Sequence, residues 1–145
     1  MPCASLRARC ALVLLGAALL LTSVAHAQDP RASAAQSAAR QFLALTDRGD
    51  AKASWQATGK QFQNGITEVQ WAKALGQVRT PVGEVVDRAL SSTEFLRTFP
   101  GAGGEGDYVI LQYRTSFAQL TGARESLTLE READGVWRVI GYIIR

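Results

Sequence analysis

The 145-residue sequence contains only two cysteines and one histidine, and all three lie within its first 27 residues. Residues 28–145 therefore have no thiol and no imidazole side chain. This excludes disulfide bonds, cysteine nucleophiles, serine-histidine-aspartate triads and zinc sites built from cysteine or histidine, because each needs one of these side chains. We expect neither a metal nor a cofactor, and a domain held together by packing alone.

The first 27 residues predict a secretory signal peptide. Arg7 and Arg9 precede an apolar stretch over residues 11–24, and the following Ala-His-Ala sequence ends at Ala27, which predicts cleavage after that residue. The apolar stretch is shorter than the roughly 20 residues that a membrane span needs. We therefore expect an exported protein, periplasmic or secreted, without a membrane span once the signal is removed.

The remaining residues 28–145 fit one domain. Of the 145 residues, 118 remain after removal of the first 27, which is too few for two domains. Two of the 16 lysines and arginines leave with the signal, so 14 face 13 acidic residues. A nearly neutral domain without a basic run predicts no nucleic-acid partner. Arginine outnumbers lysine and alanine is abundant, which is typical of GC-rich bacterial genomes and favours a periplasmic location.

Three apolar stripes at helical spacing predict three helices in the first part of this domain. Gly49 fits the position after a helix end and Asp50 fits the next N-cap, so the first two helices should meet in a tight corner. Thr67 and Gln70 form a capping box that opens the third helix, and Pro81 ends it. The stripes are Ala35, Ala38, Phe42 and Leu45, then Ala51, Trp55, Thr58 and Phe62, then Trp71, Ala74, Leu75 and Val78.

After Pro81 the hydrophobic period becomes two, which is typical of strands. A glycine-rich stretch at residues 100–106 lacks the Gly-Lys-Ser/Thr ending of a phosphate-binding loop, and we interpret it as a hairpin loop without a ligand. Helices followed by a meander predict an α+β fold, with the helices packed on one face of a curled four-stranded antiparallel sheet. The predicted strands cover residues 82–99, 108–117, 124–132 and 136–144.

Two turns predict the register of the last three strands. A three-residue loop at 120–122, with glycine in the left-handed position, pairs Phe117 with Glu125 and Tyr113 with Leu129. A two-residue Asp-Gly turn at 134–135 pairs Leu129 with Ile140 and Leu127 with Tyr142. The resulting core face contains Leu111, Tyr113, Phe117, Leu127, Leu129, Ile140, Tyr142 and Ile144.

Several aromatic, glycine and proline residues, in order along residues 38–144, resemble the bacterial family catalogued as domain of unknown function 4019. The resemblance implies an exported domain with a fold similar to the cone-shaped nuclear-transport-factor-like fold, and it brings no catalytic residues. That fold hosts isomerases, dehydratases and binding domains, so it does not choose among functions. The resembling residues are Trp55, Gln70, Trp71, and the stretches 79–83, 100–101, 106–109, 116–117 and 137–142.

The first functional hypothesis is a non-catalytic module that binds a small molecule or a periplasmic protein. Trp71, Tyr113 and Tyr142 are its candidate contacts, although aromatic residues at this spacing are more often core. The alternative is an enzyme in which Glu125, placed on the apolar face, acts as an acid or base beside Tyr113 or Tyr142. Against it, Glu125 lies near a strand end, where it can pair with an arginine or reach water. We expect no enzymatic activity.

Two further hypotheses concern the surface. Trp137, Val139 and Ile143 lie together on the face opposite the predicted core. A homodimer can bury them, which makes a dimerising structural or assembly protein a further alternative, or the N-terminal helix can cover them. Arg131 and Arg138 are predicted to stand directly opposite each other. They either leave both charged heads in water or converge on a carboxylate, which is an internal one such as Asp134 or that of an acidic ligand.

Overall fold

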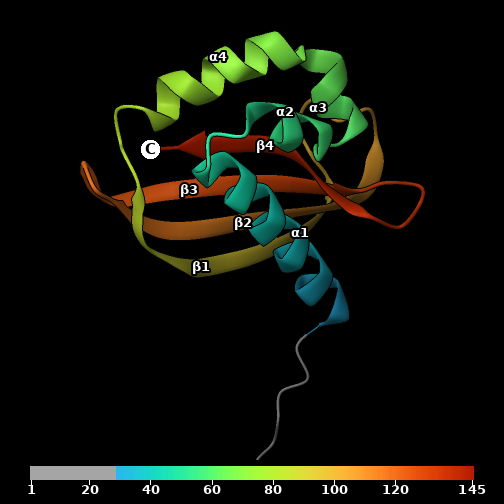
Figure 1. The fold of residues 1–145 in the computed structure, drawn as a ribbon. Helices are drawn as coiled ribbons and strands as arrows, with labels where there is room; N and C mark the ends of the chain where they lie inside the picture. Colours follow the sequence, from blue (N-terminus) through green and yellow to red (C-terminus); the bar gives the residue numbers. More distant parts are fainter. Residues whose placement is uncertain (1–28) are drawn as a thin grey trace, which may run out of the picture.

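The computed structural model describes residues 29–145, in which four helices precede four strands (Figure 1). The predicted signal peptide and its cleavage site lie outside the described residues. Helix α1 (Pro30–Asp47) crosses one face of the curled sheet, and the other helices gather beside β4 (Figure 1). The predicted α+β fold, with helices on one face of a four-stranded antiparallel meander, is confirmed. Within this range no helix is both long and apolar enough to cross a bilayer.

Local capping interactions position the first helices as the sequence predicts. The corner after α1 contains Gly49 with a φ of +70°. The side chain of Asp50 then accepts a hydrogen bond of 3.0 Å from the backbone N–H of Ala53 and begins α2 (Ala51–Gln56). The capping box of Thr67 and Gln70 opens α4 (Glu68–Arg79), so both predicted helix starts are confirmed.

The predicted second helix is wrong, because the chain leaves helical geometry in its middle. It forms two short helices, α2 and α3 (Lys60–Gly65). Between them, the N–H of Gly59 donates a hydrogen bond of 2.8 Å to the carbonyl of Val139, and Thr58 bridges the same residue. A Cβ at Gly59 would lie 2.9 Å from Ile140. Close docking on the edge of the sheet therefore overrides the helical spacing.

The sheet follows the order β1 (Val85–Thr98), β2 (Glu105–Phe117), β3 (Leu120–Arg131) and β4 (Trp137–Ile144), with all neighbours antiparallel. Strand β1 carries one extra residue, Val86 or Ser91, at each of two of the three register shifts in its pairing with β2. These bulges bend the strand and increase its local twist, which contributes to the curl of the sheet.

The register predicted for β2 and β3 is wrong: the observed pairing is shifted by four residues along β2, which is an even number. The turn comprises Ala118 and Gln119, whose N–H groups bond to the segment before β1, and Glu125 pairs with Tyr113 instead of Phe117. Gly122 does adopt a left-handed φ of +69°, but in a bulge inside β3. An even shift keeps each residue on its face, so the predicted inward position of Glu125 is unaffected.

The predicted pairing of β3 with β4 is confirmed at Leu127 and Tyr142, but it fails closer to the turn, from Leu129 onward. Because Glu132 bonds to Val136, the turn has three residues, not two, and Leu129 pairs with Val139. The extra residue in β4, Ile140, restores the register.

This bulge reverses the faces of the first half of β4. Trp137 and Val139 are 5% and 1% exposed, packed in the core, whereas Ile140 is only half-buried and lies outside it. The predicted surface patch of Trp137, Val139 and Ile143 therefore does not exist, since only Ile143 remains exposed. A homodimer as such stays a prediction.

Trp71 occupies the centre of the core between the helices and the sheet. Its ring contacts those of Phe42, Phe62 and Tyr142 at centroid distances of 6.1, 5.2 and 6.4 Å. Its indole N–H donates a buried hydrogen bond of 2.9 Å to the hydroxyl of Ser54. The side chain thus joins α1, α2, α3, α4 and β4.

Truncation of Trp71 tests this role. We expect Trp71→Ala to lower the free energy of unfolding by about 3–5 kcal/mol, because it leaves a cavity and removes the buried hydrogen bond to Ser54. The matched control is Val69→Ala, an exposed position on the same helix, with an expected change within about 0.5 kcal/mol. Urea unfolding followed by circular dichroism measures both, and equal effects would contradict the assignment.

Candidate functional site

A fully buried carboxylate, Glu125 of β3, lies at the meeting point of several elements. One of its oxygens accepts hydrogen bonds of 2.5 Å from Nε of Arg88 and 2.6 Å from the hydroxyl of Thr115. The other accepts bonds of 2.6 Å from the hydroxyl of Tyr142 and 3.1 Å from Nη2 of Arg88. All four strands thus contribute to the surroundings of one carboxylate.

The same arginine connects Glu125 to the C-terminal end of α1. Arg88 donates two hydrogen bonds, of 2.7 and 2.9 Å, to the carboxylate of Asp47. Arg79, at the end of α4, lies 3.1 Å from Asp47 and 3.8 Å from Glu125, and its guanidinium group stacks 4.7 Å above the ring of Phe117. We call Asp47, Arg79, Arg88, Thr115, Glu125 and Tyr142 the charge cluster.

Charges within the charge cluster balance, with two carboxylates and two guanidinium groups. Burial alone would lower the pKa of Arg88, but its hydrogen bonds to Asp47 and Glu125 reverse the effect and hold that pKa above its ordinary value. Burial raises the pKa of Tyr142, and the negative charge of Glu125 raises it further. Tyr142 therefore remains a neutral donor to Glu125 at physiological pH.

This geometry favours a structural role for Glu125 over acid-base chemistry. A catalytic base must lie within hydrogen-bond reach of its substrate. Both oxygens of Glu125 are already occupied, and neither of the two grooves described next is lined by it. Of the two alternatives that the sequence left open, pairing with arginine is the one observed.

One groove, of about 450 Å³, separates α1 from the first two strands. At its inner end lie Asp47 and Arg88 of the charge cluster, and Tyr113 also borders it. Arg40 and the Tyr113 hydroxyl have no hydrogen bond or ion pair with another residue of the range 29–145. We call this the α1–β1 groove; its lining is Gln36, Arg40, Leu43, Ala44, Asp47, Arg88, Leu90 and Tyr113.

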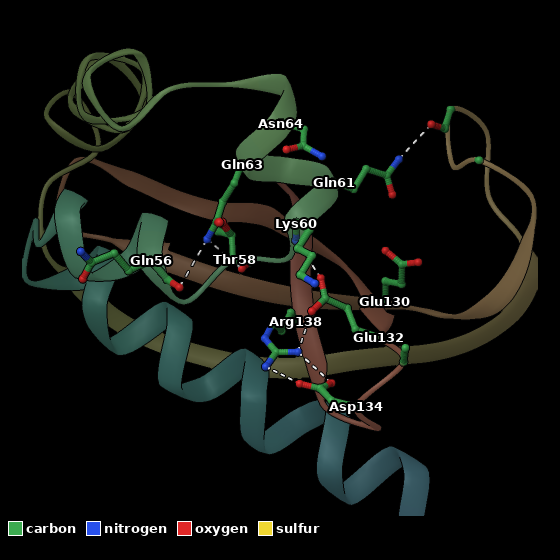
Figure 2. Close-up of a pocket in the computed structure, with 13 residues that line it drawn as sticks. Gln56, Thr58, Lys60, Gln61, Gln63, Asn64, Glu130, Glu132, Asp134 and Arg138 are labelled. Carbon is green, nitrogen blue, oxygen red and sulfur yellow. Dashed lines mark hydrogen bonds and ion pairs between the residues drawn. The ribbon is translucent and has the colours of Figure 1, made fainter.

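A larger and more open groove, of about 860 Å³, lies between α3, the β1–β2 loop and the β3–β4 turn (Figure 2). Arg138 bonds there to Glu132 at 2.6 Å and to both oxygens of Asp134 at 2.7 and 2.9 Å. The backbone N–H of Lys60 bonds to Glu132 at 2.7 Å. Hydrogen bonds from Arg138 lower the pKa of Asp134 to about 2. Three charged side chains of this groove, Glu132, Asp134 and Arg138, are therefore paired with one another.

The structure separates the residues that the sequence proposed as a binding site. Arg131 and Arg138 are not opposite each other, because the longer turn pairs Arg138 with Glu130, and Arg131 bonds to the carbonyl of Gly135. Arg138 pairs with the internal carboxylates of Glu132 and Asp134, which agrees with the alternative in which the arginine binds an internal carboxylate. Trp71 is in the core and Tyr142 is in the charge cluster, so of the aromatic candidates only Tyr113 borders the α1–β1 groove.

Asp47, Arg79 and Arg88 were missed at the sequence level. A signal was present, since Arg88, Thr115 and Glu125 place polar groups on the inner face of three neighbouring strands. Asp47 and Arg79 lie at the ends of helices, where charged residues are usually exposed to solvent. Their positions in the sequence therefore did not indicate a buried ion pair.

A family model described as "Protein of unknown function (DUF4019)" matches residues 38–142. The chain belongs to this family. The match confirms the resemblance noted in the sequence. The matched residues include the complete charge cluster as well as Arg40 and Tyr113. No curated protein matches the chain.

Removal of the buried charge tests the charge cluster. We expect Glu125→Gln to lower the free energy of unfolding by about 3–5 kcal/mol, because it leaves Arg79 and Arg88 with a single carboxylate between them. Glu94→Gln, an exposed acid on β1, is the matched control and should change it by less than about 0.5 kcal/mol. If Glu125→Gln were as stable as the wild type in denaturant unfolding, the charge cluster would not support the fold.

Alkaline pH should destabilise the protein through Tyr142. Because its pKa is raised on folding, the folded state holds the phenolic proton more tightly than the unfolded chain does. The contribution is complete below pH 10 and is lost as pH rises above it, by about 1.4 kcal/mol per pH unit. Tyr142→Phe should be less stable at neutral pH but show a shallower decline above about pH 10.

Urea unfolding at a series of pH values measures this decline, with Tyr113→Phe as a control that keeps the contribution of Tyr142. If the free energy of unfolding declined equally steeply at alkaline pH in the wild type and in Tyr142→Phe, the predicted contribution of Tyr142 would be contradicted.

Proposed function

We propose that this DUF4019 domain is a non-catalytic binding module that holds a small amphipathic acid in the α1–β1 groove. The observation that carries the proposal is that the polar groups of Arg40 and Tyr113 are unpaired among the described residues. Both border the groove, and within residues 29–145 neither the guanidinium group nor the hydroxyl has a polar partner. Two donors that converge on one groove are suited to a carboxylate.

The other walls of the groove suit an apolar tail. Leu43 and Ala44 of α1 face Leu90 of β1, which is 40% exposed although it is a large hydrophobic residue. A volume of about 450 Å³ lies within the usual range for small-molecule sites. Burial of a hydrocarbon chain against these residues contributes about 25 cal/mol for each Å² removed from water.

The electrostatics of the groove favour an anion. At its inner end, Arg88 and Asp47 form a hydrogen-bonded pair, so their charges largely cancel. Arg40 adds an uncompensated positive charge. Burial raises the pKa of Tyr113, so its hydroxyl remains protonated and able to donate.

Binding without catalysis is supported by the same contacts. Asp47 is the one carboxylate in the lining, and it accepts bonds from Arg88 and pairs with Arg79. Both oxygens of Asp47 are therefore already engaged by a guanidinium group. The first 27 residues of the sequence support export, so we place the encounter with the ligand outside the cytoplasm.

Binding of octanoate tests the proposal, with octanol as the uncharged analogue. We expect octanoate to raise the melting temperature, and Arg40→Gln to weaken its binding about tenfold or more through loss of a charge-assisted hydrogen bond. Tyr113→Phe should weaken it by a smaller factor.

Arg48→Gln, an exposed position beyond the end of α1, is the matched control and should bind octanoate as the wild type does. Isothermal titration calorimetry measures all four proteins. Equal affinity for octanol and octanoate, or unchanged affinity in Arg40→Gln, would exclude an acid-binding groove.

A further inference from the structure

Three arginines stand side by side on the sheet face turned away from the helices. Arg114 of β2 is directly opposite Arg124 of β3. Arg124 and Arg145 exchange two backbone hydrogen bonds, of 2.7 and 2.9 Å, which places Arg145 next in the same row. Successive side chains alternate between faces, and Glu125 points inward, so the guanidinium groups of the three share the outer face. We call these residues the arginine row.

No side-chain carboxylate of the described residues pairs with the arginine row. Like charges directly opposite each other destabilise a sheet. Within residues 29–145, no ion pair or side-chain hydrogen bond involves Arg114, Arg124 or Arg145, and all three are exposed. Asp87 shares the outer face, opposite Ser116, but forms no ion pair with them. By contrast, the arginines that pair with carboxylates are Arg31, Arg79, Arg88, Arg97 and Arg138.

A groove of about 400 Å³ adjoins the arginine row, and no carboxylate side chain lines it. Gln112 and Ser126 stand opposite each other in the next row and add an amide and a hydroxyl, neither of which bonds to another described residue. Ile143, which is 47% exposed, supplies one apolar contact. The lining is Gln112, Gly122, Arg124, Ser126, Ile143 and Arg145.

We propose that the arginine row and this groove bind the phosphate groups of a diphosphate-bearing ligand. Guanidinium forks bind phosphate oxygens in a bidentate manner, and Arg is the preferred residue for this recognition. Three neighbouring strands at a spacing of about 4.8 Å spread the guanidinium groups over roughly 10 Å, which accommodates two linked phosphates. A bound anion also removes the repulsion within the arginine row. The site lies on the opposite face of the sheet from the α1–β1 groove and is independent of it.

Titration with pyrophosphate tests this site. We expect binding to the wild type, a loss of affinity of about tenfold or more in Arg124→Gln, and no measurable binding when Arg114, Arg124 and Arg145 are all changed to Gln. Without ligand, these variants should melt at the wild-type temperature or above it, because a repulsion is removed. Loss of binding is then not a loss of fold. Arg40→Gln and Arg48→Gln should retain full affinity.

Two further measurements decide the outcome. Sodium chloride at matched ionic strength should not reproduce the rise in melting temperature produced by pyrophosphate. Vesicles that contain cardiolipin, whose headgroup carries two phosphates, are compared with vesicles of phosphatidylcholine to identify the source of the diphosphate: binding that is lost in the triple variant supports the site with a lipid as that source. Absence of binding to both pyrophosphate and cardiolipin, or equal binding by the wild type and the triple variant, would overturn the proposal.

Discussion

The buried carboxylate of Glu125 is the interaction on which the arrangement of this domain depends. Removal of an ionised group from water costs several kcal/mol unless partners replace its hydration. Here Arg88, Thr115 and Tyr142 supply those partners from the three other strands, and Asp47 and Arg79 extend the contact to the ends of α1 and α4. Without disulfides in the described residues, one ionic centre connects most of the elements, and through Asp47 it ties the end of α1 to the sheet.

This centre also determines which parts of the surface are available for function. The charge cluster uses its arginines internally, as the β3–β4 turn does with Arg138. Among the arginines of the described residues that have no carboxylate partner, Arg40 lies beside the α1–β1 groove and three others form the arginine row on the opposite face. The two faces of the sheet thus offer different chemistry: a groove with apolar walls and one unpaired arginine on the helix side, and an open polar row on the other side.

The order of helices and strands, the capping corner at Gly49 and Asp50 and the inward position of Glu125 were predictable, because each depends on local spacing or on alternation along one strand. The break in the second helix and most of the strand registers were not, since the turn at Ala118 is held by the segment before β1 and Ile140 forms a bulge beside Gly59. These are contacts between distant parts of the chain. The arginine that pairs with Glu125 escaped identification for the same reason, because Arg88 is 37 residues away in sequence.

The docking of Gly59 on Val139 has a consequence for assembly. An exposed strand edge invites pairing with another chain, and proteins avoid this by covering the edge or by distorting it. The link between α2 and α3 covers part of the β4 edge, whereas β1 is bent by its extra residues Val86 and Ser91. The two borders are therefore blunted by different means, and among the described residues the meander is limited to four strands. Such a sheet is protected against edge-to-edge aggregation at high concentration, which favours contacts made by side chains on its faces.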